Sequence, residues 1–173
     1  GGPTRSARRH REARELSERI IDILYTHSPQ PRTKKPRTYR QKARKAFLSI
    51  AKQKRPANKK RRAAIRQQLQ YLRRNLKHIE VMLTARPYGQ PLPLPNWLIR
   101  RYWVLPHLYD QQYEMVKANV RRCDDRIVSI SQPHLRPIVR GKLGKAVEFG
   151  AKISVSLTGV SNATPASRPN RVR

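Results

Sequence analysis

The chain has 173 residues, of which 40 are Lys or Arg and 10 are Asp or Glu, so its formal net charge is +30 and its isoelectric point is near 11.7. This excess of cations excludes a charge-balanced surface and predicts a polyanionic partner, because cations that neutralise phosphates release condensed counterions. Nucleic acid is the favoured polyanion. A membrane is excluded from the predicted partners because the sequence has no long apolar run and no signal peptide, and its basic residues are spread along the chain.

The length suits one domain or less, and two Phe and two Trp predict a modest core. Cys123 is the single cysteine, which excludes an internal disulfide and a multi-cysteine zinc site and fits a reducing cytosol. We expect a partly buried thiol there. The sequence starts at Gly1 without methionine, so the true N-terminus is left open.

The first predicted element is an amphipathic helix over residues 8–25. Its apolar positions are Ala13, Leu16, Ile20, Ile21 and Leu24. Prolines at 29, 31 and 36 then mark a basic linker that cannot continue the helix.

A second helix is predicted over residues 39–54, followed by a break near Pro56. Its inward positions are Ala43, Ala46, Phe47 and Ile50.

The clearest periodicity predicts a helix of roughly 25 residues and about 40 Å. Its seam consists of Ile65, Leu69, Leu72, Leu76, Ile79 and Leu83. Such a length suits a helical hairpin or arm. The seam is expected to pack on a neighbouring helix of the same chain, and a homodimer through residues 65–83 is the alternative that spacing leaves open.

Prolines between residues 87 and 95 predict a stiff connection to a helix over residues 96–120, with a break or kink before Pro106. Its aromatic residues are expected in the core, with base stacking as the alternative. They are Trp97, Tyr102, Trp103, Tyr109 and Tyr113.

Beyond residue 125 the period changes to alternation, which predicts antiparallel strands at residues 127–131 and 147–157 joined by a long basic loop. Two strands alone are marginally stable, so we expect a stable sheet to need more strands than the two predicted in this chain. Residues 158–173 lose all periodicity and are expected to form a disordered basic tail.

Between Asp22 and Glu80 the sequence has nineteen Lys and Arg and no acidic residue. A solvated surface usually mixes both signs, whereas an unmixed run repels itself unless a polyanion neutralises it, so nucleic-acid contact is favoured. Phosphate contacts carry no base sequence, so no target site follows. The predicted contact residues are Arg32, Lys34, Lys35, Arg37, Arg40, Arg44, Lys45, Lys59, Lys60, Arg61, Arg62, Arg66, Arg73, Arg136, Arg140 and Lys142.

Two-metal phosphoryl transfer needs several converging carboxylates, and the chain offers few. Glu12, Glu15 and Glu18 are expected on the exposed side of the first helix, paired with arginines. Asp124 and Asp125 precede the first predicted strand, and a turn is the default for such a pair. The five histidines have no metal-ligand spacing, and no phosphate-binding glycine loop is present.

A long block of sequence closely resembles the mid-region of bacterial insertion-sequence transposases of the DDE class. It comprises residues 125–134 (Asp-Arg-Ile-Val-Ser-Ile-Ser-Gln-Pro-His), 136–142 (Arg-Pro-Ile-Val-Arg-Gly-Lys) and 147–152 (Val-Glu-Phe-Gly-Ala-Lys). The Thr-Tyr-Arg at 38–40 and the Leu-Arg-Arg-Asn-Leu at 72–76 resemble the basic helical insertion of that group. The resemblance covers residues 11–157.

The resemblance implies an RNase-H-like fold in which three carboxylates bind two divalent metals, usually magnesium, and direct DNA cleavage and joining. In that family the first Asp precedes this region, and the second Asp and the Glu follow the strand that resembles residues 148–150. The sequence matches neither flank, and Asp124 and Asp125 match no catalytic position. No catalytic residue, metal ligand or cofactor is therefore assigned to this chain, and Mg²⁺ is expected only for a full-length relative.

The resulting prediction is an α+β, mainly α, truncated transposase that binds DNA, with cleavage expected only of the full-length relative. Its segments are an N-terminal helix and linker (1–37), a basic helical insertion (38–122), two strands of an incomplete RNase-H-like sheet (123–158) and the tail (159–173). The expected location is the bacterial cytoplasm, with the nucleoid. The alternatives are a non-enzymatic nucleic-acid module, architectural or ribosome-associated, and an inert translated remnant.

Overall fold

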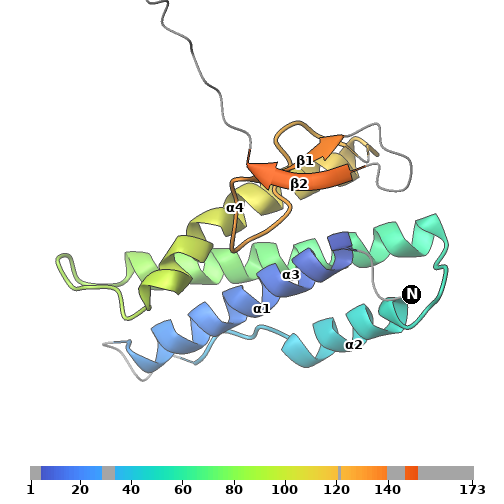
Figure 1. Ribbon diagram of the computed structural model, residues 1–173. Helices are drawn as coiled ribbons and strands as arrows, with labels where there is room; N and C mark the ends of the chain where they lie inside the picture. Colours follow the sequence, from blue (N-terminus) through green and yellow to red (C-terminus); the bar gives the residue numbers. More distant parts are fainter. Residues whose placement is uncertain (1–4, 29–33, 121, 140–146, 152–173) are drawn as a thin grey trace, which may run out of the picture.

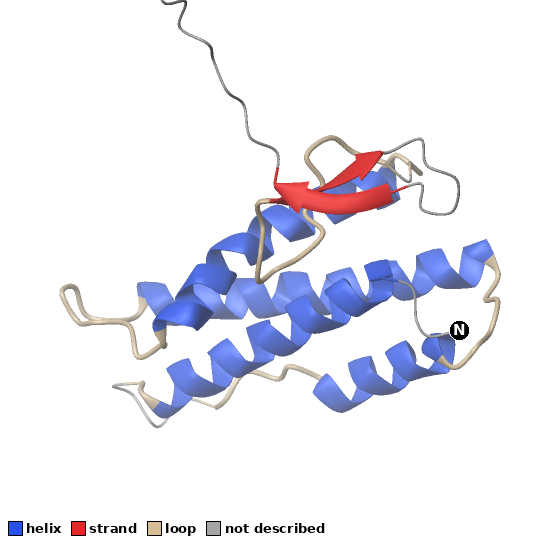
Figure 2. Cartoon of the chain, viewed as in Figure 1, coloured by secondary structure: helices blue, strands red, loops and turns tan. Residues whose placement is uncertain are grey.

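The computed structural model describes residues 5–28, 34–120, 122–139 and 147–151, and this part of the chain is mainly helical (Figures 1 and 2). Its elements, in chain order, are α1 (Arg5–Thr26), α2 (Arg40–Ala51), α3 (Asn58–Thr84), α4 (Asn96–Lys117), β1 (Leu135–Val139) and β2 (Val147–Ala151). The prediction of a mainly α chain is confirmed, and each of the four predicted helices is present.

Helices α1 and α3 lie side by side and run in the same direction, with α2 and α4 antiparallel on either side of this pair (Figure 1). Hydrogen bonds from Arg14 to Gln68 and between Ser17 and Asn75 show the parallel course, because both partners advance along the chain together. Among the described elements, α2 and α4 do not contact each other. Helices α1 and α3 therefore form the central pair, and each contacts the other three helices.

The apolar face of α1 forms the centre of the core, as its periodicity predicted. Ala13, Ile20 and Ile21 have no exposed surface, and Leu16 and Leu24 are buried. They join buried residues of α3, α4 and the chain after α4 in one cluster. In α2 the two inward residues that become buried are Ala43 and Phe47.

The seam of α3 is covered within the chain by α1. Leu72 and Ile79 belong to the same buried cluster as the apolar face of α1, and Leu69 is also buried. The prediction of a neighbouring helix as partner is confirmed. The alternative, a homodimer through residues 65–83, is wrong because α1 already occupies that surface.

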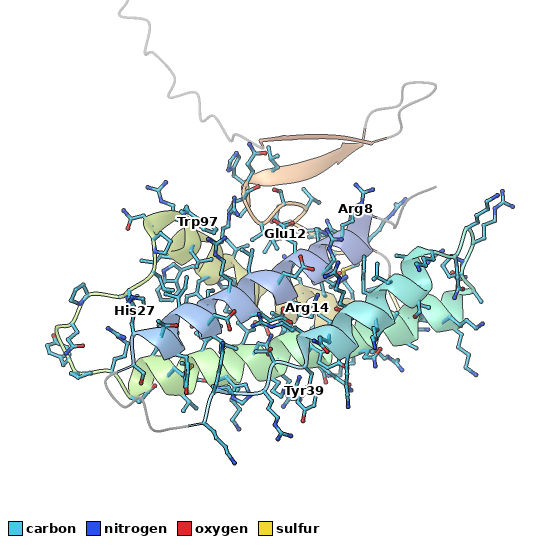
Figure 3. The ribbon with its side chains drawn as sticks, turned by 90° about the horizontal axis from the view of Figure 1, so that it is seen from below. Arg8, Glu12, Arg14, His27, Tyr39 and Trp97 are labelled. Carbon is cyan, nitrogen blue, oxygen red and sulfur yellow. The ribbon has the colours of Figure 1, made fainter. Side chains whose placement is uncertain are left out.

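Arg14 is buried between α1 and α3, with its side chain 1% exposed (Figure 3). Its Nε donates to Oε1 of Gln68 at 3.1 Å, and one terminal nitrogen binds Glu18. Gln68 in turn donates from Nε2 to the carbonyl oxygen of Ala43 at 3.0 Å. A series of hydrogen bonds thus joins α1, α3 and α2. Because the groups involved are buried, water cannot replace these bonds.

The expectation that Glu18 lies on an exposed side of the first helix is wrong, because this residue is 6% exposed. Burial raises the pKa of the Glu18 carboxyl, against the opposing effect of Arg14. A buried cation needs a bound acceptor, and the i,i+4 position of Glu18 brings its carboxylate to Arg14. Glu15 is exposed, as predicted.

Replacing Arg14 with Met should lower the free energy of unfolding by about 3–5 kcal/mol, because Glu18 and Gln68 lose their buried partner. Urea unfolding at neutral pH measures this change. Arg8→Met is the matched control on the exposed surface of α1, and its effect should stay within about 0.5 kcal/mol. Equal losses in the two variants would show that the buried network does not stabilise the fold.

The linker before α2 is attached to α1 by Asp22. The Asp22 carboxylate accepts from Nζ of Lys35 at 2.7 Å and from the Arg40 guanidinium at 2.8 and 2.9 Å. Partial burial opposes ionisation of Asp22, but the hydrogen bonds from Lys35 and Arg40 outweigh it and lower the pKa of the carboxyl. The start of α2 is therefore held beside α1.

Since the pKa of Asp22 is lower in the folded chain than in the unfolded one, this carboxylate stabilises the fold above its ordinary pKa and stops doing so as the pH falls through the lowered value. Asp22→Asn should cost less than about 1 kcal/mol at neutral pH, because the pair is partly exposed. The difference from wild type should vanish in acid. Thermal unfolding from pH 7 down to pH 2 tests this, and a difference that grew on acidification would contradict it.

Helix α4 continues through Pro106. Of the break or kink predicted before this residue, the break is therefore wrong and the kink stays a prediction. A proline inside a helix costs about 3 kcal/mol through its missing N–H and its steric clash. The flanking Leu105 and Leu108 are fully buried, and their burial offsets this cost.

The aromatic residues of α4 divide between core and surface. Tyr102 and Tyr109 pack against the core, as predicted. Trp97, Trp103 and Tyr113 are 38%, 65% and 44% exposed, so the expectation of core packing is wrong for them. The Trp97 ring is covered by the guanidinium groups of two arginines, one from α1 and one from α4, each 4.9 Å from its centroid.

The strand predicted at residues 127–131 is wrong. Ile127 and Ile130 are both buried in the helical core, which the two-residue alternation of a strand does not allow. The Ile127 N–H donates to Oε1 of Gln111, and its carbonyl accepts from Arg9, so its backbone groups bind side chains instead of another strand. This segment is a covering loop on α1 and α4.

Strands β1 and β2 pair antiparallel, with Leu135 opposite Ala151 and Val139 opposite Val147. The second predicted strand begins at the same residue as β2, and its part beyond Ala151 lies outside the described residues. So does the predicted tail at 159–173. Among the described elements, the strands contact only each other.

Candidate nucleic-acid interface

The acid-free segment of the sequence forms one structural unit, residues 40–77, which we term the basic hairpin. It consists of α2, the connection at 52–57 and α3 as far as Lys77. Helices α2 and α3 run antiparallel and pack together through Ala43, Phe47 and Leu69, with the connection at one end of the molecule (Figure 1). The cations between these apolar positions are thereby left on the outside.

Most cations of residues 34–77 face solvent without a carboxylate partner. Fifteen of the eighteen that the structure describes are exposed, and the other three are partly buried. Of the described cations in this range, only Lys35 and Arg40 pair with a carboxylate, that of Asp22. The positive charge is therefore not neutralised within the described part of the fold.

The tip of the basic hairpin concentrates this charge. It carries five exposed cations, Lys52, Lys54, Arg55, Lys59 and Lys60. Helix α3 begins there with no acidic residue in its first turn and no side-chain hydrogen bond at its N-cap. The free N–H groups and the helix dipole add to the positive potential of the lysines. This potential lowers the stability of the isolated protein and favours binding of an anion at the tip.

The charge at this end of α3 opposes its stability, so Lys59→Glu should raise the free energy of unfolding by about 0.3–1 kcal/mol at low salt. Lys77→Glu makes the same charge change far from the N-terminus of α3 and should give no such gain. Thermal unfolding of both variants at low and high salt provides the comparison. Equal stability changes in the two variants would show that the gain in stability comes from the lower net charge alone.

The structure places the predicted contact residues in three groups. Ten are exposed on the linker or the basic hairpin: Lys34, Lys35, Arg37, Arg40, Arg44, Lys45, Lys59, Lys60, Arg66 and Arg73. Arg61 and Arg62 are partly buried and turn toward α4. Arg32, Arg140 and Lys142 lie outside the described residues, as does the side chain of Arg136.

Sequence reasoning missed several cations of the same surface, namely Lys42, Lys52, Lys54, Arg55 and Lys77. They belong to the same acid-free run, so the run itself was the signal that could have found them. Partial burial lowers the pKa of His78, and the charges of Arg74 and Lys77 lower it further, which reports the positive field along α3.

An aromatic cluster lies at the start of the basic hairpin, on the opposite side of α1 from Trp97 (Figure 3). The Arg74 guanidinium lies 4.2 Å from the centroid of Tyr39 and 5.3 Å from that of Tyr71. Tyr39 has φ 53°, a left-handed conformation that a non-glycine residue rarely adopts, and the residue remains 39% exposed. The sequence pattern did not predict the contact between Tyr39 and Arg74, because these residues lie far apart in the chain.

The described residues hold no group of three or more His, Cys, Asp or Glu that could bind a metal ion. Asp124 and Asp125 form a turn, as predicted, and both are exposed. Cys123 is partly buried, also as predicted.

No helix in the described ranges is both long enough and apolar enough to cross a membrane. No protein-family model, curated protein or solved structure matches the chain. The resemblance of residues 11–157 to DDE transposases therefore stays a prediction.

Proposed function

We propose that this protein binds DNA through the basic hairpin, by contacts between its exposed lysines and arginines and the phosphate backbone. The observation that carries the proposal is the eighteen described cations of residues 34–77, of which sixteen have no carboxylate partner among the described side chains. Such a surface binds a polyanion because counterion release drives the association. It positions the protein on a duplex and reads no base sequence.

We further propose that the basic hairpin is the helical insertion of a DDE-class transposase and that β1 and β2 belong to its RNase-H-like sheet. The sequence block at residues 125–152 supports this reading, as does its position directly after a basic helical region. Mg²⁺-dependent cleavage and strand transfer would belong to a full-length relative. The cytoplasm, with the nucleoid, is the corresponding location.

The test is the affinity of the full chain for a duplex oligonucleotide across a salt series. A surface that contacts phosphates gives a linear fall of log K with log salt, with a slope of about 0.9 for each neutralised phosphate. The double variant Lys59→Gln/Lys60→Gln should reduce the slope by roughly 1–2 and weaken binding equally for unrelated sequences. Fluorescence anisotropy measures both quantities.

The matched control is Arg8→Gln/Arg100→Gln, which removes the same charge from exposed positions of α1 and α4. Its slope should remain close to that of the wild type. Equal loss in both double variants would show that net charge, and not the basic hairpin, determines binding.

A parallel series with structured RNA and with Mg²⁺ separates the proposal from its rivals. Preference for RNA over duplex DNA at equal salt would favour a ribosome-associated or architectural module. Magnesium-dependent cleavage that is lost in Asp124→Ala or Asp125→Ala would overturn the assignment of these residues to a turn without catalysis. If the chain bound neither DNA nor RNA at low salt, the remaining explanation would be an inert translated remnant.

A further inference from the structure

A pocket of about 480 Å³ lies between the first two turns of α3 and the C-terminal end of α4. This volume falls within the range of small-ligand sites, which is about 300–1,000 Å³. Three arginines, Arg61, Arg62 and Arg126, stand around it, and Ile65, Met115 and Val120 contribute apolar surface. The pocket therefore combines positive charge with an apolar wall.

The pocket is separate from the outer surface of the basic hairpin because α3 presents different residues on its two sides. Asn58, Arg61, Arg62 and Ile65 recur at helical spacing and face α4. Lys60 and Arg66 instead line the groove between α2 and α3. Arg61 and Arg62, which the sequence assigned to the phosphate-binding surface, thus belong to a different site.

The pocket is built from several elements and is held in place. Arg62 donates to the Val116 carbonyl oxygen at 3.4 Å and so joins α3 to α4. Gln112, which is 3% exposed, lines the pocket and is hydrogen-bonded at 3.1 Å to His10 of α1. These contacts fix the walls before any ligand arrives.

No Asp or Glu is among the residues that line the pocket. The charge of Arg126 acts on Arg9, which is 8% exposed and donates to the Ile127 carbonyl oxygen, and whose Nε has no partner among the described atoms. Burial and the neighbouring charge of Arg126 lower the pKa of Arg9 to about 10. Arg9 and Arg126 repel each other, and an anion bound at Arg126 would relieve that repulsion.

We propose that this pocket binds a single nucleotide, with the phosphate held by Arg61, Arg62 and Arg126 and the flat nucleoside against Ile65, Met115 and Val120. Guanidinium groups suit phosphate because they offer paired N–H donors, and the apolar wall accepts a base through dispersion and burial. The N-terminal N–H groups of α3 reinforce the phosphate end. The inference goes beyond duplex binding by the basic hairpin and does not rest on it.

Isothermal titration of the full chain with adenosine 5′-monophosphate at about 0.15 M salt tests the site, with adenosine and inorganic phosphate as partial ligands. Arg61→Gln should weaken binding about tenfold, the effect of one charge-assisted hydrogen bond. Val120→Trp fills the pocket without changing charge and should abolish binding. Because Val120 is 49% exposed in the wild type, this change does not disturb the core.

The matched controls are Arg66→Gln, which removes one charge from the side of α3 that lines the groove with α2, and Val81→Trp, which adds the same bulk at an exposed position near the C-terminal end of α3. Both should bind the nucleotide as the wild type does. Equal weakening by Arg61→Gln and Arg66→Gln, or unchanged binding by Val120→Trp, would overturn the proposal. So would inorganic phosphate binding as tightly as the nucleotide.

The nucleotide could be free or the end of a strand, and competition distinguishes the two sources. Displacement of the mononucleotide by a 5′-phosphorylated oligonucleotide at lower concentration than by its 5′-hydroxyl counterpart would identify a strand end. Equal displacement by both would identify a free nucleotide. Duplex binding by Val120→Trp serves as the independent readout, since it should persist if the basic hairpin holds DNA.

Discussion

The buried Arg14 guanidinium is the centre of a hydrogen-bond network that joins three of the four helices. It is almost fully buried, so each of its donors needs a partner from the protein itself. Glu18 supplies a carboxylate from the next turn of α1, and Gln68 supplies an amide oxygen from α3 and passes the connection to α2 through Ala43. Apolar side chains alone would permit α3 to slide along α1, whereas these directional bonds fix one register.

This interior arrangement bears on the surface charge. The chain has ten acidic residues, and α1 uses Glu15, Glu18 and Asp22 to hold Arg14, Arg11, Lys35 and Arg40. These acids of α1 thus stabilise the helix packing, and among the described residues they pair with no cation of the basic hairpin beyond Arg40. These ion pairs stabilise the fold, whereas the exposed lysines and arginines repel one another. A bound polyanion would remove this repulsion.

Helix α3 contributes to two surfaces because adjacent faces of its first turns meet different helices. One side of its first turns lies along α2 and carries the outward cations, while the adjacent side faces α4 and encloses the arginine pocket. A straight helix of 27 residues keeps these two sides in a fixed relation. The proposed duplex contact and the proposed nucleotide site are therefore adjacent but chemically different, one open and charged, the other partly enclosed and partly apolar.

The sequence by itself determined the four helices, the core face of α1 and the acid-free basic segment, because helical periodicity and charge are local properties of the chain. It did not determine which helix covers the seam of α3. The apolar residues of the seam have the same spacing whether the partner helix belongs to the same chain or to a second copy. Residues 127–131 read as a strand since their alternation is local, yet tertiary packing placed Ile127 and Ile130 on the same core. Only the tertiary structure buried Glu18, separated Arg61 and Arg62 from the outer cations and brought Tyr39 under Arg74, since each of these depends on contacts between elements distant in sequence.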